Sequence, residues 1–151
     1  MRLAVFVAIL QCVVNANEIV LSPTLQYFTI APPQIDMNLA VLVLSARDHV
    51  ERRNAIRESW AHGHSNVFFF VGKHCPYRPE QRKPWVCEPK HSSMKIDPEY
   101  NAEQEIITDR LSKEPKVLIV DMIDVYRNLP KKLIQGYLWI HRHTLAKYVL
   151  K

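Results

Sequence analysis

The sequence predicts an α/β fold, in which the strands of a mostly parallel sheet alternate with helices along residues 39–151. Short apolar runs of the kind found in strands buried on both faces occur at 39–44, 67–71 and 117–120. The segments between these runs are richer in charged residues and carry helical signals. A chain of 151 residues with a hydrophobic content of 48% is long enough to form one domain with its own core.

The first two elements are a strand and a helix. The apolar run 39–44 predicts the strand, and Asp48 is a suitable N-cap for a helix that extends to about Trp60. Ile56 and Trp60 are one turn apart, so we expect them to share one face of that helix, with Val50 or Arg53 a turn earlier. The glycine within residues 62–64 ends it.

The later elements follow from the same kinds of signal. We expect Asn128 to cap the last helix, in which Leu129, Leu133, Tyr137 and Ile140 lie close to one apolar stripe. The pattern predicts further strands at 67–71, 117–120 (followed by Asp121) and 147–150, and helices at 102–111 and 128–142.

The N-terminus resembles a targeting segment. Residues 1–16 combine one basic residue, an apolar run and a small-residue site. The run is shorter than the ~20 apolar residues of a membrane span, which favours a cleaved signal peptide over an anchor. Residues 17–38 contain several prolines and are expected to form a short stem. Residues 39–151 then form the folded domain, which is expected to enter the secretory pathway.

Cys75 and Cys87 flank a polar, proline-rich loop. In an oxidising compartment they can form a disulfide, and closing a loop of this size contributes on the order of 3 kcal/mol. The alternatives are a metal site with His74 and His91, or free thiols. Because four ligands at zinc-finger spacing are absent from the sequence, the disulfide is favoured.

Candidate binding residues occur in the helix after the first strand. Ligands of parallel α/β sheets bind at the carboxyl ends of the strands. Arg53 and Arg57 are one helical turn apart, and two guanidinium groups so placed can clamp a pyrophosphate. The alternative is a solvated basic face whose charges pair with Glu51 or Glu58.

A second group of candidates follows the third strand. Asp121 and Asp124 could orient a sugar hydroxyl or a metal-bound water, although Asp124 and Asn128 could equally serve in a turn and a helix cap. Lys132 could meet a phosphate or remain solvated. The net charge of +5 favours anionic partners. Because the sequence contains no glycine-rich phosphate loop and no nucleic-acid-binding motif, nucleic acid is not an expected partner.

Three of these segments resemble the family 31 β-1,3-glycosyltransferases. The R-x-x-I-R-x-S/T-W pattern of that family is similar to residues 53–60, and its D-x-x-D-x-Y-x-N-L-x-x-K block is similar to residues 121–132. Residues 147–151 resemble the strand that leads into the family's T-D-D-D metal motif. The cysteine segment resembles the N-acetylgalactosaminyltransferase branch of the family.

The resemblance implies a GT-A fold, a UDP-sugar donor, a glycan or glycoprotein acceptor and Mn²⁺. The implied reaction transfers Gal, GlcNAc or GalNAc in β-1,3 linkage with inversion at the anomeric carbon. It further implies a type II membrane protein of the Golgi apparatus or endoplasmic reticulum, whose leader is a signal-anchor; a cleaved leader would give a secreted form. The donor-binding residues that it implies are Arg53, Arg57, Asp121, Tyr126, Asn128 and Lys132.

The resemblance covers only the N-terminal part of such an enzyme. The sequence ends after the fourth predicted strand, so the metal ligands and the catalytic residues are expected beyond Lys151. The chain as written is therefore expected to be inactive. The alternative function is a non-catalytic luminal module that binds a nucleotide-sugar or a partner chain.

Overall fold

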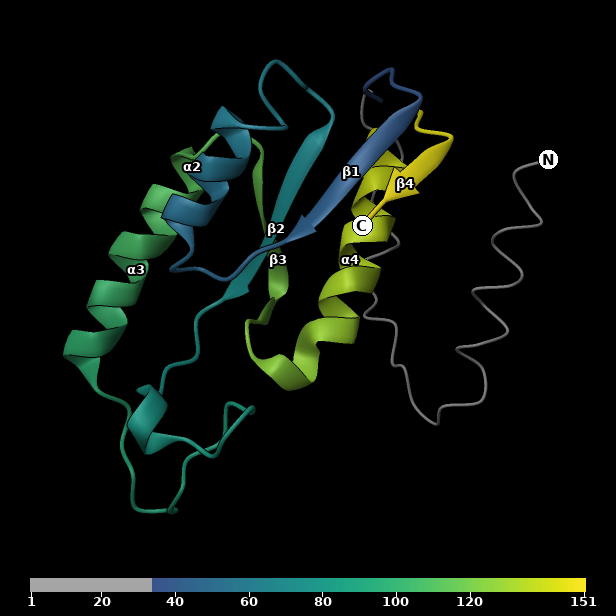
Figure 1. Cartoon of the computed structure of the whole chain (residues 1–151). Helices are drawn as coiled ribbons and strands as arrows, with labels where there is room; N and C mark the ends of the chain where they lie inside the picture. Colours follow the sequence, from purple (N-terminus) through teal and green to yellow (C-terminus); the bar gives the residue numbers. More distant parts are fainter. Residues whose placement is uncertain (1–33) are drawn as a thin grey trace, which may run out of the picture. The chain divides into compact units, whose positions relative to one another are not determined.

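The structure, a computed structural model, describes residues 34–151 (Figure 1). The predicted targeting segment (1–16) and most of the predicted stem lie outside the described residues. The elements in chain order are β1 (Leu39–Leu44), α2 (Val50–Glu58), β2 (Val67–Lys73), the 3₁₀ turn η2 (Pro79–Gln81), α3 (Pro98–Lys113), β3 (Val117–Ile123), the 3₁₀ turn η3 (Tyr126–Asn128), α4 (Leu129–His143) and β4 (Tyr148–Leu150).

The four strands form one sheet in the order β3-β2-β1-β4, and every neighbouring pair is parallel. Figure 1 shows α2 and α3 on one face of the sheet and α4 on the other. The chain thus steps from β1 to β3 toward one edge, then crosses the opposite face through α4 to place β4 on the other side of β1. The predicted α/β fold with a mostly parallel sheet is confirmed.

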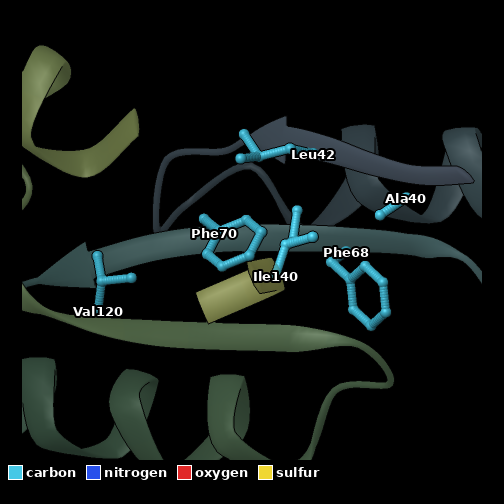
Figure 2. Close-up of a cluster of buried hydrophobic side chains, with 6 residues drawn as sticks. All are labelled: Ala40, Leu42, Phe68, Phe70, Val120 and Ile140. Carbon is cyan, nitrogen blue, oxygen red and sulfur yellow. The ribbon is translucent and has the colours of Figure 1, made fainter. Parts of the chain in front are cut away.

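The central strands are buried on both faces, as their continuous apolar runs predict. On the α4 face, Phe68 and Phe70 of β2 pack in one cluster with Leu42 and Ile140 (Figure 2). On the α2 face, Phe69 belongs to a second cluster of buried side chains. Successive residues of a strand point to opposite faces, so the consecutive phenylalanines serve both cores.

The helix after β1 differs from its prediction at both ends. Its N-cap is His49 rather than Asp48, and the cap makes no side-chain hydrogen bond. The helix ends at Glu58, so Trp60 lies outside it and is 55% exposed. The expectation that Ile56 and Trp60 share one face of this helix was wrong, because Trp60 lies beyond its end. The chain turns after the helix so that Ala61, whose N–H donates to Ile56 O at 3.1 Å, takes the buried position.

Helix α3 begins four residues before its predicted start. Asp97 is its N-cap, and its carboxylate accepts from the backbone N–H groups of Glu99 and Tyr100 at 3.0 and 3.2 Å. Pro98 occupies the first turn, where its missing N–H costs nothing. The helix continues to Lys113, beyond the predicted end.

The buried side of α4 is only partly the predicted stripe. Ile140 is buried, and Leu133 packs against the same cluster, but Leu129 and Tyr137 are exposed. Gly136 faces the sheet instead, and a Cβ atom added there would lie 2.7 Å from Leu42 Cδ1. The helix approaches the sheet too closely for a side chain at this position.

The segment that precedes β1 is hydrogen-bonded to the segment that joins α4 to β4. The N–H of Ile35 donates to His143 O at 2.7 Å, and the N–H of Leu145 donates to Ile35 O at 2.9 Å. The last residues of the predicted stem are therefore hydrogen-bonded to the folded domain. No helix within residues 34–151 is long and apolar enough to cross a membrane.

The predicted disulfide between Cys75 and Cys87 is confirmed, with Cα atoms 5.7 Å apart. It closes the loop that follows β2. The alternatives of a metal site and of free thiols are thereby excluded for these two cysteines.

Candidate functional site

The carboxyl end of the sheet has the topology that places ligand sites in α/β proteins. The chain leaves β1 toward β2 on one side, and β4 lies on the other side of β1. The order of strands therefore reverses between β1 and β4, and ligands bind outside the carboxyl ends of the strands at such a reversal. Residues 45–47, which follow β1, are at this point.

Lys132 joins the carboxyl ends of three strands. Its Nζ donates to Ser45 O, after β1, at 2.6 Å, and to both oxygens of Asp124, after β3, at 2.8 and 2.9 Å. Asp124 Oδ2 also accepts from the N–H of Gly72 in β2 at 3.1 Å. Lys132 is 3% exposed, so the predicted alternative of a solvated lysine was wrong.

The environment of Lys132 opposes its charge. Burial lowers the pKa of Lys132, the hydrogen bonds and charge of Asp124 act in the opposite direction, and the charge of Arg53 lowers the pKa further. A buried ammonium group of this kind depends on its carboxylate partner. The Lys132–Asp124 pair is therefore a structural unit of the sheet edge.

Arg53 is the second buried cation at this edge, and it is 1% exposed. Its Nε and Nη2 donate to the two carboxylate oxygens of Glu114 at 2.9 Å each. Its remaining N–H groups donate to Ser45 Oγ at 2.9 Å, Ala46 O at 2.6 Å and Arg47 O at 3.4 Å. All five N–H donors of the guanidinium group are thus engaged by the protein.

Arg57 lies one turn further along α2 and shares the carboxylate of Glu114. Its Nη2 donates to Glu114 Oε2 at 3.2 Å and to Pro115 O at 2.9 Å, and its guanidinium lies over the ring of Phe69. The hydrogen bond from Arg53 is the largest of the effects that lower the pKa of Glu114. The two arginines therefore face the same way, as their spacing predicts, but their partner is neither Glu51 nor Glu58.

Arg47, which follows β1, carries another guanidinium group at the carboxyl edge. Its Nη1 donates to Gly72 O at 3.2 Å, and its Nη2 donates to Gln104 O at 3.0 Å and to Thr108 Oγ1 at 2.7 Å. Burial lowers the pKa of Arg47, while nearby carboxylates, first that of Asp124, raise it. Its buried Nε has no hydrogen-bond partner among the described residues.

Of the remaining predicted residues, Tyr126 and Asn128 lie after β3, in η3, whereas Asp121 lies within β3, which extends to Ile123 and so runs past its predicted end at residue 120. Asp121 is exposed and forms an ion pair with Lys73. Tyr126 is 69% exposed, and its ring lies against that of Trp85. Asn128 precedes α4, as predicted, but its side chain donates to Ile123 O at 3.0 Å instead of capping the helix.

Residues 34–151 contain no group of three or more His, Cys, Asp or Glu side chains that could hold a metal ion. The Asp124 carboxylate is occupied by Lys132 and by the N–H of Gly72. Mn²⁺ prefers several oxygen ligands in an octahedral arrangement. The described residues do not fit this ion, and we assign no step to it.

Sequence reasoning missed Glu114 and Trp85. Glu114 is 61 residues from Arg53 in sequence, so no local pattern links them. Trp85 stands out in the sequence only as an aromatic residue between prolines and the second cysteine.

A scan against protein-family models finds no match, and neither the curated proteins nor the solved structures contain a match. What this chain does is therefore argued from the sheet edge and from the sequence patterns themselves.

Proposed function

We propose that this chain is the nucleotide-sugar-binding part of a GT-A-type, family 31 β-1,3-glycosyltransferase. Such an enzyme transfers Gal, GlcNAc or GalNAc from a UDP-sugar to a glycan acceptor. The observation that carries the proposal is the reversal of strand order between β1 and β4, with the polar side chains of Ser45 and Arg47 following β1. A mononucleotide bound at this reversal has its phosphates next to the ends of the strands.

The proposal divides the predicted donor-binding residues by their accessibility. Asp121 and Tyr126 are exposed at the carboxyl edge, and they contact the donor. Arg53 and Lys132 are buried, with their N–H groups engaged by the protein, so they shape the edge and hold its strands. Asn128 supports the same edge through its hydrogen bond to the end of β3.

Arg57 is assigned to the supporting group. It lines a hollow of about 220 Å³ together with Val67, the first residue of β2. That hollow lies toward the amino ends of the strands, away from the reversal. The buried cations Arg53 and Lys132 contact Ser45 itself. Two further cations lie at the carboxyl edge: Arg47, which contacts Gly72, and Lys73, which pairs with Asp121.

Calorimetric titration of the full chain with UDP tests the proposal. Lys73→Ala removes an exposed cation from the carboxyl edge, and a charge-assisted bond to phosphate is worth about 1.5–3 kcal/mol, so UDP affinity should fall about tenfold or more. Lys113→Ala is the matched control. Lys113 also forms an exposed ion pair with an aspartate, Asp109, but it is the last residue of α3, away from the reversal.

Unchanged UDP binding in Lys73→Ala, or an equal loss in Lys113→Ala, would contradict the assignment. Failure of the wild-type chain to bind UDP would contradict the proposed function itself. In a form that extends past Lys151, UDP binding strengthened by Mn²⁺ supports an enzyme, whereas binding indifferent to the metal supports the non-catalytic module.

A further inference from the structure

Two exposed aromatic rings meet at the end of the disulfide loop. Trp85 is 71% exposed, the highest value for a large hydrophobic side chain within residues 34–151, and Tyr126 is nearly as exposed. Their ring centroids are 5.5 Å apart and the ring planes make an angle of 61°. We call this pair, Trp85 and Tyr126, the aromatic corner. The two rings form two walls at an angle, so part of each remains open to solvent.

The protein holds Trp85 in an unfavourable backbone conformation. Its φ of 68° lies in the left-handed region, which is a genuine outlier for a bulky residue. Three links maintain this conformation: the disulfide from Cys75 to Cys87 beside it, the bond from the Lys83 N–H to Glu88 O at 2.8 Å, and the bond from the Arg127 N–H to Trp85 O at 3.1 Å. Such strain concentrates at binding sites, and burial of the indole does not account for it here.

The aromatic corner stands at the carboxyl edge of the sheet. Cys75 follows Lys73, the last residue of β2, by two positions, and Tyr126 follows Asp124 by two positions. Asp124 belongs to the Lys132 pair that ties the strand ends together. Both rings are therefore carried by segments that leave the edge where the nucleotide is proposed to bind.

We propose that the aromatic corner binds a pyranose ring of galacto configuration, an inference that rests on the proposed function. In such a sugar the axial C4 hydroxyl lies on one face, which leaves the C3, C4 and C5 hydrogens together on the other. This C–H face is apolar and slightly positive, and it complements the negative face of an aromatic ring. Charged side chains close to the rings in sequence, those of the exposed Lys83–Glu88 ion pair and of Arg127, supply hydrogen-bond donors and acceptors for the hydroxyls.

Saturation-transfer NMR on the full chain tests this inference with methyl β-D-galactopyranoside as the probe. Methyl β-D-glucopyranoside, which lacks the continuous C–H face, is the stereochemical control. We expect saturation at H3, H4 and H5 of the galactoside and about fivefold weaker binding of the glucoside.

The informative variant is Trp85→Asn, because asparagine tolerates the left-handed conformation and the loop keeps its backbone. Galactoside binding should fall about fivefold to tenfold in this variant. Tyr126→Ala, which removes the second wall, should have a similar effect. Trp60→Asn, which removes another exposed indole outside the corner, should leave binding unchanged.

Two results would overturn the inference: no saturation of the galactoside by the wild-type chain, or wild-type affinity in Trp85→Asn. Titration of the same variants with UDP and with UDP-galactose identifies the source of the sugar. If Trp85→Asn weakens UDP-galactose but not UDP, the corner binds the donor sugar; if it weakens only the free galactoside, the corner binds the acceptor glycan. If the wild-type chain binds the galactoside but not UDP, the proposed function is refuted, whereas the assignment of a galactoside site to the aromatic corner is supported.

Discussion

Replacing Lys132 by methionine tests the role given to the buried ion pair. The side chains are similar in length, but the variant loses the ammonium that donates to Ser45 O and to both oxygens of Asp124. Breaking a buried pair by removing one partner costs about 3–5 kcal/mol. Because the Asp124 side chain is 15% exposed and keeps its bond from Gly72, we expect the lower end, about 3 kcal/mol.

Urea unfolding followed by circular dichroism measures this loss, with the slope against denaturant expected to stay unchanged. The thermal midpoint should fall by roughly 10 °C. Lys113→Met is the control, since it breaks the exposed Lys113–Asp109 pair, which is worth about 0.3–0.5 kcal/mol. The Lys132→Met/Asp124→Asn double variant should lose at least about 1 kcal/mol less than the sum of the single variants. The proposed interaction between Lys132 and Asp124 would be refuted if the losses of the two single variants simply add in the double variant. It would also be refuted if Lys132→Met lost no more stability than Lys113→Met.

Three further predictions concern stability. Hydrogen bonds from Arg53 hold the pKa of Glu114 below its ordinary value of 4.5, so the unfolded chain takes up this proton first as the pH falls. The stability that Glu114 contributes is present above pH 4.5 and is lost as the pH drops through the pKa of the folded state. When the free energy of unfolding is measured against pH, the difference between wild type and Glu114→Gln should therefore become smaller as the pH falls below 4.5. Gly72→Ala should cost about 2–3 kcal/mol in urea unfolding, because the added Cβ would lie 2.8 Å from a backbone oxygen, whereas Gly63→Ala, which has open space but a φ of 74°, should cost about 1 kcal/mol. The Cys75→Ser/Cys87→Ser variant should lose about 3 kcal/mol, and a reductant should lower the thermal midpoint of the wild type but not that of this variant.

The strands were predictable because their burial leaves a local signature. β2 lies between β1 and β3 and is covered on both faces, so consecutive positions of this strand are buried and are filled by apolar residues. The disulfide was predictable because its two cysteines flank one short loop. In each case the physical cause acts on residues that are close in sequence.

The misread helix boundaries have two different causes. The signal for α3 was present, since Asp97 and Pro98 form a standard cap and first turn, but the prediction began only at residue 102. The end of α2 had no comparable signal. Helical spacing from Ile56 points to Trp60, yet the chain turns at Ser59, whose hydroxyl donates to Ala55 O at 2.6 Å.

The candidate site could be located by sequence only as a set of strand ends. The partners that define its charge come from distant elements, as when Glu114 binds Arg53 across 61 positions. A sequence window offers only nearby partners such as Glu51. The assignment of donor-binding residues therefore stays a prediction, which the UDP titrations address.

Because two arginines share one carboxylate, their cluster carries a net positive charge. Arg53 and Arg57 each carry a positive charge and Glu114 carries a single negative one, so one unit of positive charge remains uncompensated within this cluster. Arg53 holds its part of that charge rigidly beneath Ser45, where little water screens it. An anion that approaches the end of β1 therefore meets an attractive potential that is already oriented, and no side chain has to reorganise to create it.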